Sequence, residues 1–391
     1  MLMRWRPFLA PAWGLAAALV GLTTLAASCK AVASPPELRR RLPPLSAEYL
    51  PWRGRLTQAL TWAGHVDAET ATGLRGGLER ETTAELVAHA GFELDTTRAG
   101  WWEGGRFRFD LLGVSSGDPS GDVVGDVQGV SNLAAPSQFR LYALSYRQQF
   151  THALHLRVGL MDLNNDFVVT RVASTLVNSS FGILPTLSAN VPTPIYPATG
   201  LGGIAGVDGK WLSARAAVFQ GDPGRLGALF NQGHLAIGEA EFHSARARNT
   251  PASTKLTLGL WHYASASAAV ASTGGYYAIA QHRWLLAGGR QLGAFVQFGE
   301  NTRTTDTVPR YLGLGLRLVR PFQSRPNDLA SVGIARAWVH GARAETSYEV
   351  TYAAQLGPRI YLQPDLQYVV HPSGVYPNAL VGILRIHFEF F

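Results

Sequence analysis

Charged side chains recur at alternate positions in several short segments of the chain, a spacing that places each set on one face of an extended strand. Arg106, Arg108 and Asp110 form one set, and His155 with Arg157 forms another. The other residues on these faces are Glu85, His89, Glu93, Trp211, Arg215, Glu239, Glu241, Trp261 and Glu349. Arginine donates hydrogen bonds and carboxylates accept them. A wall that mixes the two can therefore replace the hydration of a neutral polyhydroxyl solute without trapping an ion.

Motifs for catalysis or metal binding are missing from the sequence. There is no HExxH and no GxSxG. The segment that starts at Asp118 resembles a calcium loop, but its twelfth position is Gly129 where such a loop needs Glu. We therefore predict no catalytic residue, no metal and no cofactor. Serine, histidine and aspartate are all present, so composition alone leaves an outer-membrane barrel enzyme as an alternative.

The first 33 residues read as a secretory signal peptide. Arg4 and Arg6 precede an apolar run over residues 8–27, and Ala31-Val32-Ala33 supplies the small residues of a cleavage site. Two alternatives are a membrane-anchor helix, because the run is almost long enough to span, and lipidation at Cys29.

Cleavage after residue 33 would remove the single cysteine together with Arg4, Arg6 and Lys30, which lowers the formal net charge from +7 to +4. The predicted mature chain has no apolar run of 18 residues, yet the whole sequence holds 42 Gly and only 16% charged residues. That composition is unusual for a soluble protein. Its arginines are scattered, so no nucleic-acid partner is expected.

The stretch from Ile360 to Phe391 shows the strand pattern most clearly. Apolar side chains occupy its even positions and polar ones most of its odd positions, with a turn at Pro372-Ser373-Gly374. Two such strands at an aromatic C-terminus suggest the closing hairpin of an outer-membrane β-barrel. The alternative is the edge hairpin of a secreted, soluble β-sandwich.

The alternating pattern over the whole mature chain predicts an all-β, transmembrane antiparallel barrel. Fifteen alternating segments follow a Pro- and Arg-rich periplasmic lead-in over residues 34–54, and the barrel occupies 55–391. A bacterial barrel has an even number of strands, so we predict a sixteenth near Gly200–Val207. The first segment is placed at Arg55–Gly64, and the seventh of the sixteen begins at Trp211.

The segment Met161–Thr199 is too long for an ordinary connection and is expected to fold inward and narrow the lumen. Ser115–Ser137 is expected to be a surface loop.

The order of several short motifs resembles the carbohydrate-selective porins of the OprB type. These motifs include Gly100 to Gly105 (GWWEGG), Gly159-Leu160-Met161-Asp162, and Asn178 to Gly182 (NSSFG). They continue with Tyr196-Pro197, Gly221-Asp222-Pro223 and Gln363 to Tyr368 (QPDLQY). The resemblance implies a barrel of 16 strands in the Gram-negative outer membrane that passes mono- or oligosaccharides by diffusion, often as a homotrimer.

The resemblance also implies contact with outer-membrane lipid and with the barrel assembly machinery. The chain departs from the family at its end, because its apolar series is in step with Phe390 rather than with Phe391. A general or non-sugar diffusion channel of the same fold remains an alternative. Trp284, Trp338, Tyr368 and Phe388 are expected in the interfacial aromatic belts, and Trp101-Trp102 is expected to be an interfacial anchor.

Pore-lining residues are predicted from the strand faces and from the inward segment. Arg108, Asp110 and Arg157 are the first choices on the wall, and the inward segment adds Asp162, Asn164 and Asp166. Arg215, Glu239 and Glu241 complete the charged set. Trp211, like Trp261, could stack an aromatic face on a sugar ring.

Overall fold

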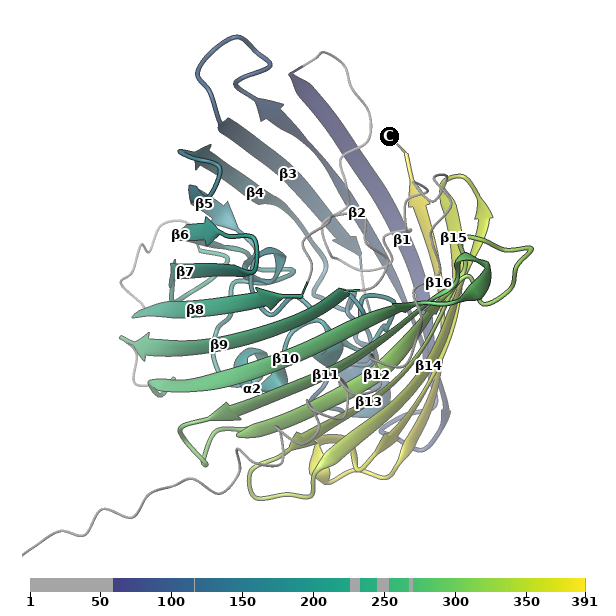
Figure 1. Cartoon of the computed structure of the whole chain (residues 1–391). Helices are drawn as coiled ribbons and strands as arrows, with labels where there is room; N and C mark the ends of the chain where they lie inside the picture. Colours follow the sequence, from purple (N-terminus) through teal and green to yellow (C-terminus); the bar gives the residue numbers. More distant parts are fainter. Residues whose placement is uncertain (1–58, 116, 226–232, 245–252, 267–269, 391) are drawn as a thin grey trace, which may run out of the picture.

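The period-two alternation builds sixteen antiparallel strands within the described residues, each hydrogen-bonded to its neighbours in the sequence, and β1 pairs with β16 to close the ring. A computed structural model describes residues 59–115, 117–225, 233–244, 253–266 and 270–390 (Figure 1). Closure gives every strand two partners, so the barrel has no open edge. The predicted signal peptide, the lead-in and Phe391 lie outside the described residues.

The strands are β1 (Leu60–Arg75), β2 (Thr82–Asp95), β3 (Gly105–Ser115), β4 (Gln138–Gln149), β5 (Leu154–Met161), β6 (Gly200–Asp208), β7 (Leu212–Gln220), β8 (Gly233–His243), β9 (Ser253–Ser265), β10 (Thr273–Leu285), β11 (Gln291–Asn301), β12 (Arg310–Val319), β13 (Leu329–Trp338), β14 (Glu345–Gly357), β15 (Ile360–Val370) and β16 (Ala379–Glu389). The short helical turns are η1 (Pro119–Val124), η2 (Leu163–Asn165), η3 (Ser179–Phe181), α2 (Pro185–Ser188), η4 (Ala287–Gly289) and η5 (Pro372–Gly374). In the part of the chain that the structure describes, no helix has the length and hydropathy of a membrane span.

The predicted sixteenth strand is confirmed as β6, but the prediction for the first strand was misplaced. β1 starts at Leu60 and runs to Arg75, whereas the expected strand ended at Gly64. Its second half alternates His65, Asp67 and Glu69 with Val66, Ala68 and Thr70. Those outward residues are small or weakly apolar, so this half gave little strand signal.

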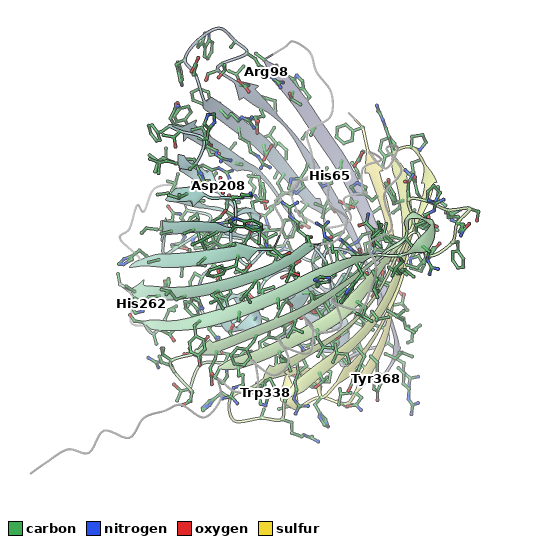
Figure 2. All side chains as sticks on the ribbon, in the orientation of Figure 1. His65, Arg98, Asp208, His262, Trp338 and Tyr368 are labelled. Carbon is green, nitrogen blue, oxygen red and sulfur yellow. The ribbon has the colours of Figure 1, made fainter. Side chains whose placement is uncertain are left out.

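The outer face carries the apolar series, as the alternation predicts. Leu384, Ile386 and Phe388 on β16 are each 40–45% exposed, while Arg385 and His387 between them are buried. Trp338 and Tyr368 lie toward the end of the barrel opposite Arg98 (Figure 2). Trp101 and Trp102 are exposed on the turn between β2 and β3, and Trp102 Nε1 donates to the Tyr146 hydroxyl at 2.7 Å.

The segment between β5 and β6 folds into the barrel, as predicted, and α2 lies inside the ring of strands (Figure 1). Its apolar side chains form one buried cluster with the inner faces of β6 to β13. Phe181 meets Phe295 edge-to-face with ring centroids 5.8 Å apart, and the Tyr311 hydroxyl donates to the Ser180 carbonyl at 2.9 Å. Gly333 on β13 leaves room for this packing, because a Cβ there would lie 2.6 Å from the Phe181 ring.

Two carboxylates hold the inward segments by their backbones. Glu349 on β14 accepts from Val177 N at 2.5 Å and from Asn178 N at 3.1 Å. Glu345, at the start of the same strand, accepts from Val127 N at 2.9 Å and from Gln128 N at 3.1 Å. One wall strand therefore fixes the β5–β6 segment and the β3–β4 segment together.

The prediction of a surface loop at Ser115–Ser137 was wrong. Val123, Val124 and Val130 from this segment are buried with Ala71 on β1 and Val381 on β16. The segment is rich in Gly and Asp, which suggested solvent exposure, but three of its four valines pack beneath the β1–β16 seam.

Candidate functional site

The lumen wall is largely apolar under the β5–β6 segment and polar opposite it, although Arg215, Glu239, Glu241 and Lys255 place charges on β7 to β9 as well. The β5–β6 segment covers the apolar inner faces of β6 to β13. The opposite half, on β14 to β16 and β1 to β5, carries buried ionisable side chains such as Glu69, Glu85, Asp110, Arg157 and Arg385. A solute in the lumen would therefore meet the outside of the inward segments on one side and, where the β3–β4 segment does not cover it, a polar wall on the other.

Asp166 links two arginines that stand on different strands. Arg157 on β5 donates from Nη1 to Asp166 Oδ2 at 2.9 Å and from Nε to Ser145 Oγ at 3.2 Å. Arg215 on β7 donates to the Asp166 backbone carbonyl. The start of the inward segment is thus tied both to β5, the strand that it leaves, and to β7.

Arg215 continues the network toward two glutamates on β8. Its Nη2 lies 3.3 Å from Glu241 Oε2, and its Nε lies 3.7 Å from Glu239 Oε1. Glu241 also accepts from Lys255 Nζ at 2.7 Å. Glu239 accepts from Val168 N at 2.9 Å. Each charge in this network has an opposite partner, so the network presents little net charge to a solute.

The Arg108–Asp110 pair lies on the neighbouring part of the wall. Arg108 Nε donates to Asp110 Oδ2 at 2.5 Å, from two positions along the same face of β3. Tyr142 on β4 donates its hydroxyl to Asp162, which also accepts from Asn164 N at 2.7 Å. Burial raises the pKa of Asp162, and these two hydrogen bonds offset part of that effect.

The structure brings together nine of the ten predicted site residues and separates the tenth. Asn164 donates from Nδ2 to the carbonyls of Phe167 and Gly182, so it braces the inward segment as well as facing inward. Trp211 lies outside β7, on the turn after β6, where it is 54% exposed and Lys210 Nζ lies 5.0 Å from the centroid of its ring. The wall prediction for Trp211 fails because β7 starts one residue later. Trp261 is 3% exposed beneath the β5–β6 segment and has no free ring face for a sugar.

Sequence reasoning missed a second polar network at the seam. Arg385 Nε donates to Glu69 Oε2 at 2.6 Å, and its Nη2 donates to Asn132 Oδ1 at 2.8 Å. His387 Nδ1 lies 2.8 Å from Asp67 Oδ1. Arg385 and His387 stand out as charged residues between the apolar positions of the last strand, but their partners lie on β1, where the strand was misplaced.

The described residues hold no group of three or more His, Cys, Asp or Glu side chains that could bind a metal ion. The polar half-wall holds pairs of opposite charge in hydrogen-bond contact, such as Arg157 with Asp166 and Arg385 with Glu69, and hydroxyl and amide groups lie beside them. Such a surface can exchange hydrogen bonds with sugar hydroxyls and gives ions no strong binding site.

Comparison with known proteins agrees with this geometry. Residues 82–390 match the family described as carbohydrate-selective porin, OprB family. OprB of Pseudomonas putida at high pH superposes with a TM-score of 0.76 at 20% identity, covering 85% of this chain and 94% of that one. Its low-pH structure gives 0.58 at 18% identity, with 85% and 93% covered.

A porin mutant of Rhodopseudomonas blastica also shares the fold, with a TM-score of 0.52 at 12% identity over 85% of this chain and all of that one. No curated protein sequence matches the chain. The family match covers well over half of the sequence. The chain therefore belongs to the OprB family of carbohydrate-selective porins, and its function is the passive, carbohydrate-selective diffusion of sugars across the Gram-negative outer membrane.

Proposed function

We propose that sugars cross this porin along the polar half-wall, and that Arg108, Asp110, Arg157, Asp162 and Asp166 exchange hydrogen bonds with their hydroxyl groups on the way. Paired opposite charges support this route best. Arg157 with Asp166, and Arg108 with Asp110, offer a donor and an acceptor side by side. A sugar hydroxyl is both donor and acceptor and can use both, whereas an ion is repelled by one member of each pair.

Wall charge also bears on the alternative of a general diffusion channel. Paired donors and acceptors on the wall can recognise one class of solute, which a pore that selects by width alone does not require. The family and the barrel fold are those of a channel rather than an enzyme. Selectivity among solutes is thus the property to measure.

The experiment measures solute uptake into liposomes that contain the purified, refolded protein. Arg157→Ala should raise the half-saturating glucose concentration by about tenfold, because a hydrogen bond to a charged group contributes roughly 1.5 kcal/mol or more. The same variant should shift ion selectivity toward cations, since Asp166 loses its side-chain partner.

Arg98→Ala is the matched control. It removes the same charge from the exposed turn after β2, where the Arg98 side chain is 51% exposed (Figure 2). If Arg157→Ala leaves the half-saturating glucose concentration unchanged, the proposed role of this wall is wrong. Equal uptake of glucose and a similar-sized amino acid by the native protein would favour the general channel.

The remaining partners follow from the same family. We place the apolar outer face in contact with outer-membrane lipid, and the C-terminal strand in contact with the barrel assembly machinery. A homotrimer is the oligomeric state we propose. Light scattering of the detergent-solubilised protein measures it, and a monomer mass would refute it.

A further inference from the structure

A cavity of about 270 Å³ lies between the two inward segments. The β3–β4 segment contributes Gln128 and Asn132 to its lining, and the β5–β6 segment contributes Asn164 and Asn165. Its size is near the lower end of the roughly 300–1,000 Å³ range of small-molecule pockets. The space therefore suits one small solute rather than a long chain of sugars.

The four carboxamides keep hydrogen-bonding capacity that the protein does not use. Gln128 is 3% exposed, and its Oε1 is buried without a hydrogen-bond partner. Asn132 accepts through Oδ1 from Arg385, and among the described residues its Nδ2 donates to none. A buried amide oxygen without a partner costs folding free energy, so a polar ligand that supplies a hydroxyl would recover it.

Asn164 and Asn165 add groups from the opposite side. Asn164 Nδ2 is occupied by two backbone carbonyls, which leaves its Oδ1 as an acceptor. The Asn165 side chain is half-buried and makes no hydrogen bond with the rest of the described chain. The cavity thus presents amide donors and acceptors from two separate segments.

Charge around the cavity is low. Neither Lys nor Arg lines it. Asp162 is the one carboxylic acid in the lining, and both of its oxygens are engaged, by the Tyr142 hydroxyl and by Asn164 N. Tyr196 also lines the cavity, and its hydroxyl donates to the Leu133 carbonyl at 2.7 Å. An anionic ligand would find no counter-charge here.

Apolar side chains complete the lining. Leu176, Phe181, Ile183 and Ile195 border the same space. A pyranose ring has hydroxyls at its rim and C–H groups on its faces, so it can use amides and apolar carbons together. A linear polyol or an amino acid lacks that combination of a polar rim and an apolar face.

We propose that this cavity is a binding station for a single neutral pyranose, adjacent to the charged wall, with which it shares Asp162. The inference rests on the proposed sugar route and adds a second, uncharged recognition step to it. Amides from both inward segments contact the hydroxyls, and the apolar border contacts the ring face.

The test uses the full-length barrel in planar bilayers, with D-glucose as the probe and current noise as the measure of glucose binding. Gln128→Leu and Asn165→Leu should each raise the glucose dissociation constant by about tenfold, the effect of one lost hydrogen bond of moderate strength. Conductance without sugar should change little. Asn165 is the safer site, since its side chain holds no part of the fold in place. Gln323→Leu, on the exposed turn after β12, is the control and should leave glucose binding unchanged.

The ligand class is tested by comparing D-glucose with D-glucuronate on the native protein. Glucose should bind at least tenfold more tightly, and equal binding of the two would overturn the neutral-ligand assignment. An unchanged glucose dissociation constant in both cavity variants would overturn the proposal that the cavity binds glucose. Failure of the proposed route gives a different result. Liposomes that contain the native protein would then take up glucose no faster than an amino acid, whatever the cavity variants do.

Discussion

Single residues on the wall act through partners that the alternation of residues along a strand does not reveal. Alternation places Arg157, Arg215, Glu239 and Glu241 on the inner face, and all four are found there. Asp166, the partner that the two arginines share, comes from the inward segment. The sequence marks it as polar, but only the fold brings it between two arginines. The face of a residue was predictable, whereas its contacts depend on where a loop of about forty residues comes to rest.

Asp126 on the β3–β4 segment gives a pH dependence at the residue scale. Burial, reinforced by the nearby Glu345 carboxylate, raises the pKa of Asp126 from 3.8 to about 7. Because the packed state holds the proton more tightly than the released state, packing is fully favoured below pH 3.8. That advantage is lost as the pH rises through about 7. Current fluctuations of single channels should therefore increase between about pH 5 and about pH 8.

Asp126→Asn should remove most of this pH dependence, because asparagine stays neutral. Asp122→Asn on the same segment is the matched control, since Asp122 is exposed, and it should behave like the native protein. An unchanged pH profile in Asp126→Asn would assign the effect to a different group.

At the scale of elements, the strands were predictable and the loops were not. A closed bacterial barrel needs an even strand count, and this rule located β6 although three of its inward positions are glycine. Length alone indicated that the β5–β6 segment folds inward. The shorter β3–β4 segment has the length and composition of an ordinary surface loop. The role of its valines is clear only from the structure, where they lie against the strands of the seam.

Gly333 tests how the inward segment is seated. Replacing it with Leu would drive a side chain into Phe181 and Leu176, whose atoms lie 2.6 and 2.9 Å from the position of an added Cβ. Overpacking of this kind costs about 1–3 kcal/mol, so the β5–β6 segment should loosen. Open-channel conductance should rise, and protease should cleave the segment faster.

Gly238→Leu is the paired control on the outer face of β8. An added Cβ there meets nothing closer than the Arg215 carbonyl at 4.0 Å, so the barrel should behave as the native protein does. Equal conductance in both variants would mean that the seating of the segment does not set the width of the pore.

For the whole molecule, composition and alternation were enough to identify a barrel with a polar lumen. They were not enough to show that most of the inner wall from β6 to β13 is apolar and covered by the β5–β6 segment, while the opposite wall is mostly charged. Phe295, Tyr311 and Trp261 face inward in strict alternation, yet a water-filled pore has no use for them. Their burial makes sense only with the inward segment in place.

Export makes a prediction for the whole chain. If the first 33 residues are a signal peptide, the protein purified from outer membranes should begin at Ser34, which N-terminal sequencing or intact mass would show. A mass that includes residues 1–33 would support the anchor alternative. Added lipid at Cys29 would support lipidation instead.

The seam between β1 and β16 has a consequence for the order of assembly. It joins Asp67 to His387 and Glu69 to Arg385, and valines of the β3–β4 segment pack beneath it. The β3–β4 segment contacts both strands of the seam, so its packing and the pairing of β16 with β1 support each other. A chain without β16 would lose more than the strand itself, because Glu69 and Asp67 would lose Arg385 and His387 as partners in the lumen. The pairing that completes the cylinder therefore also neutralises part of the channel.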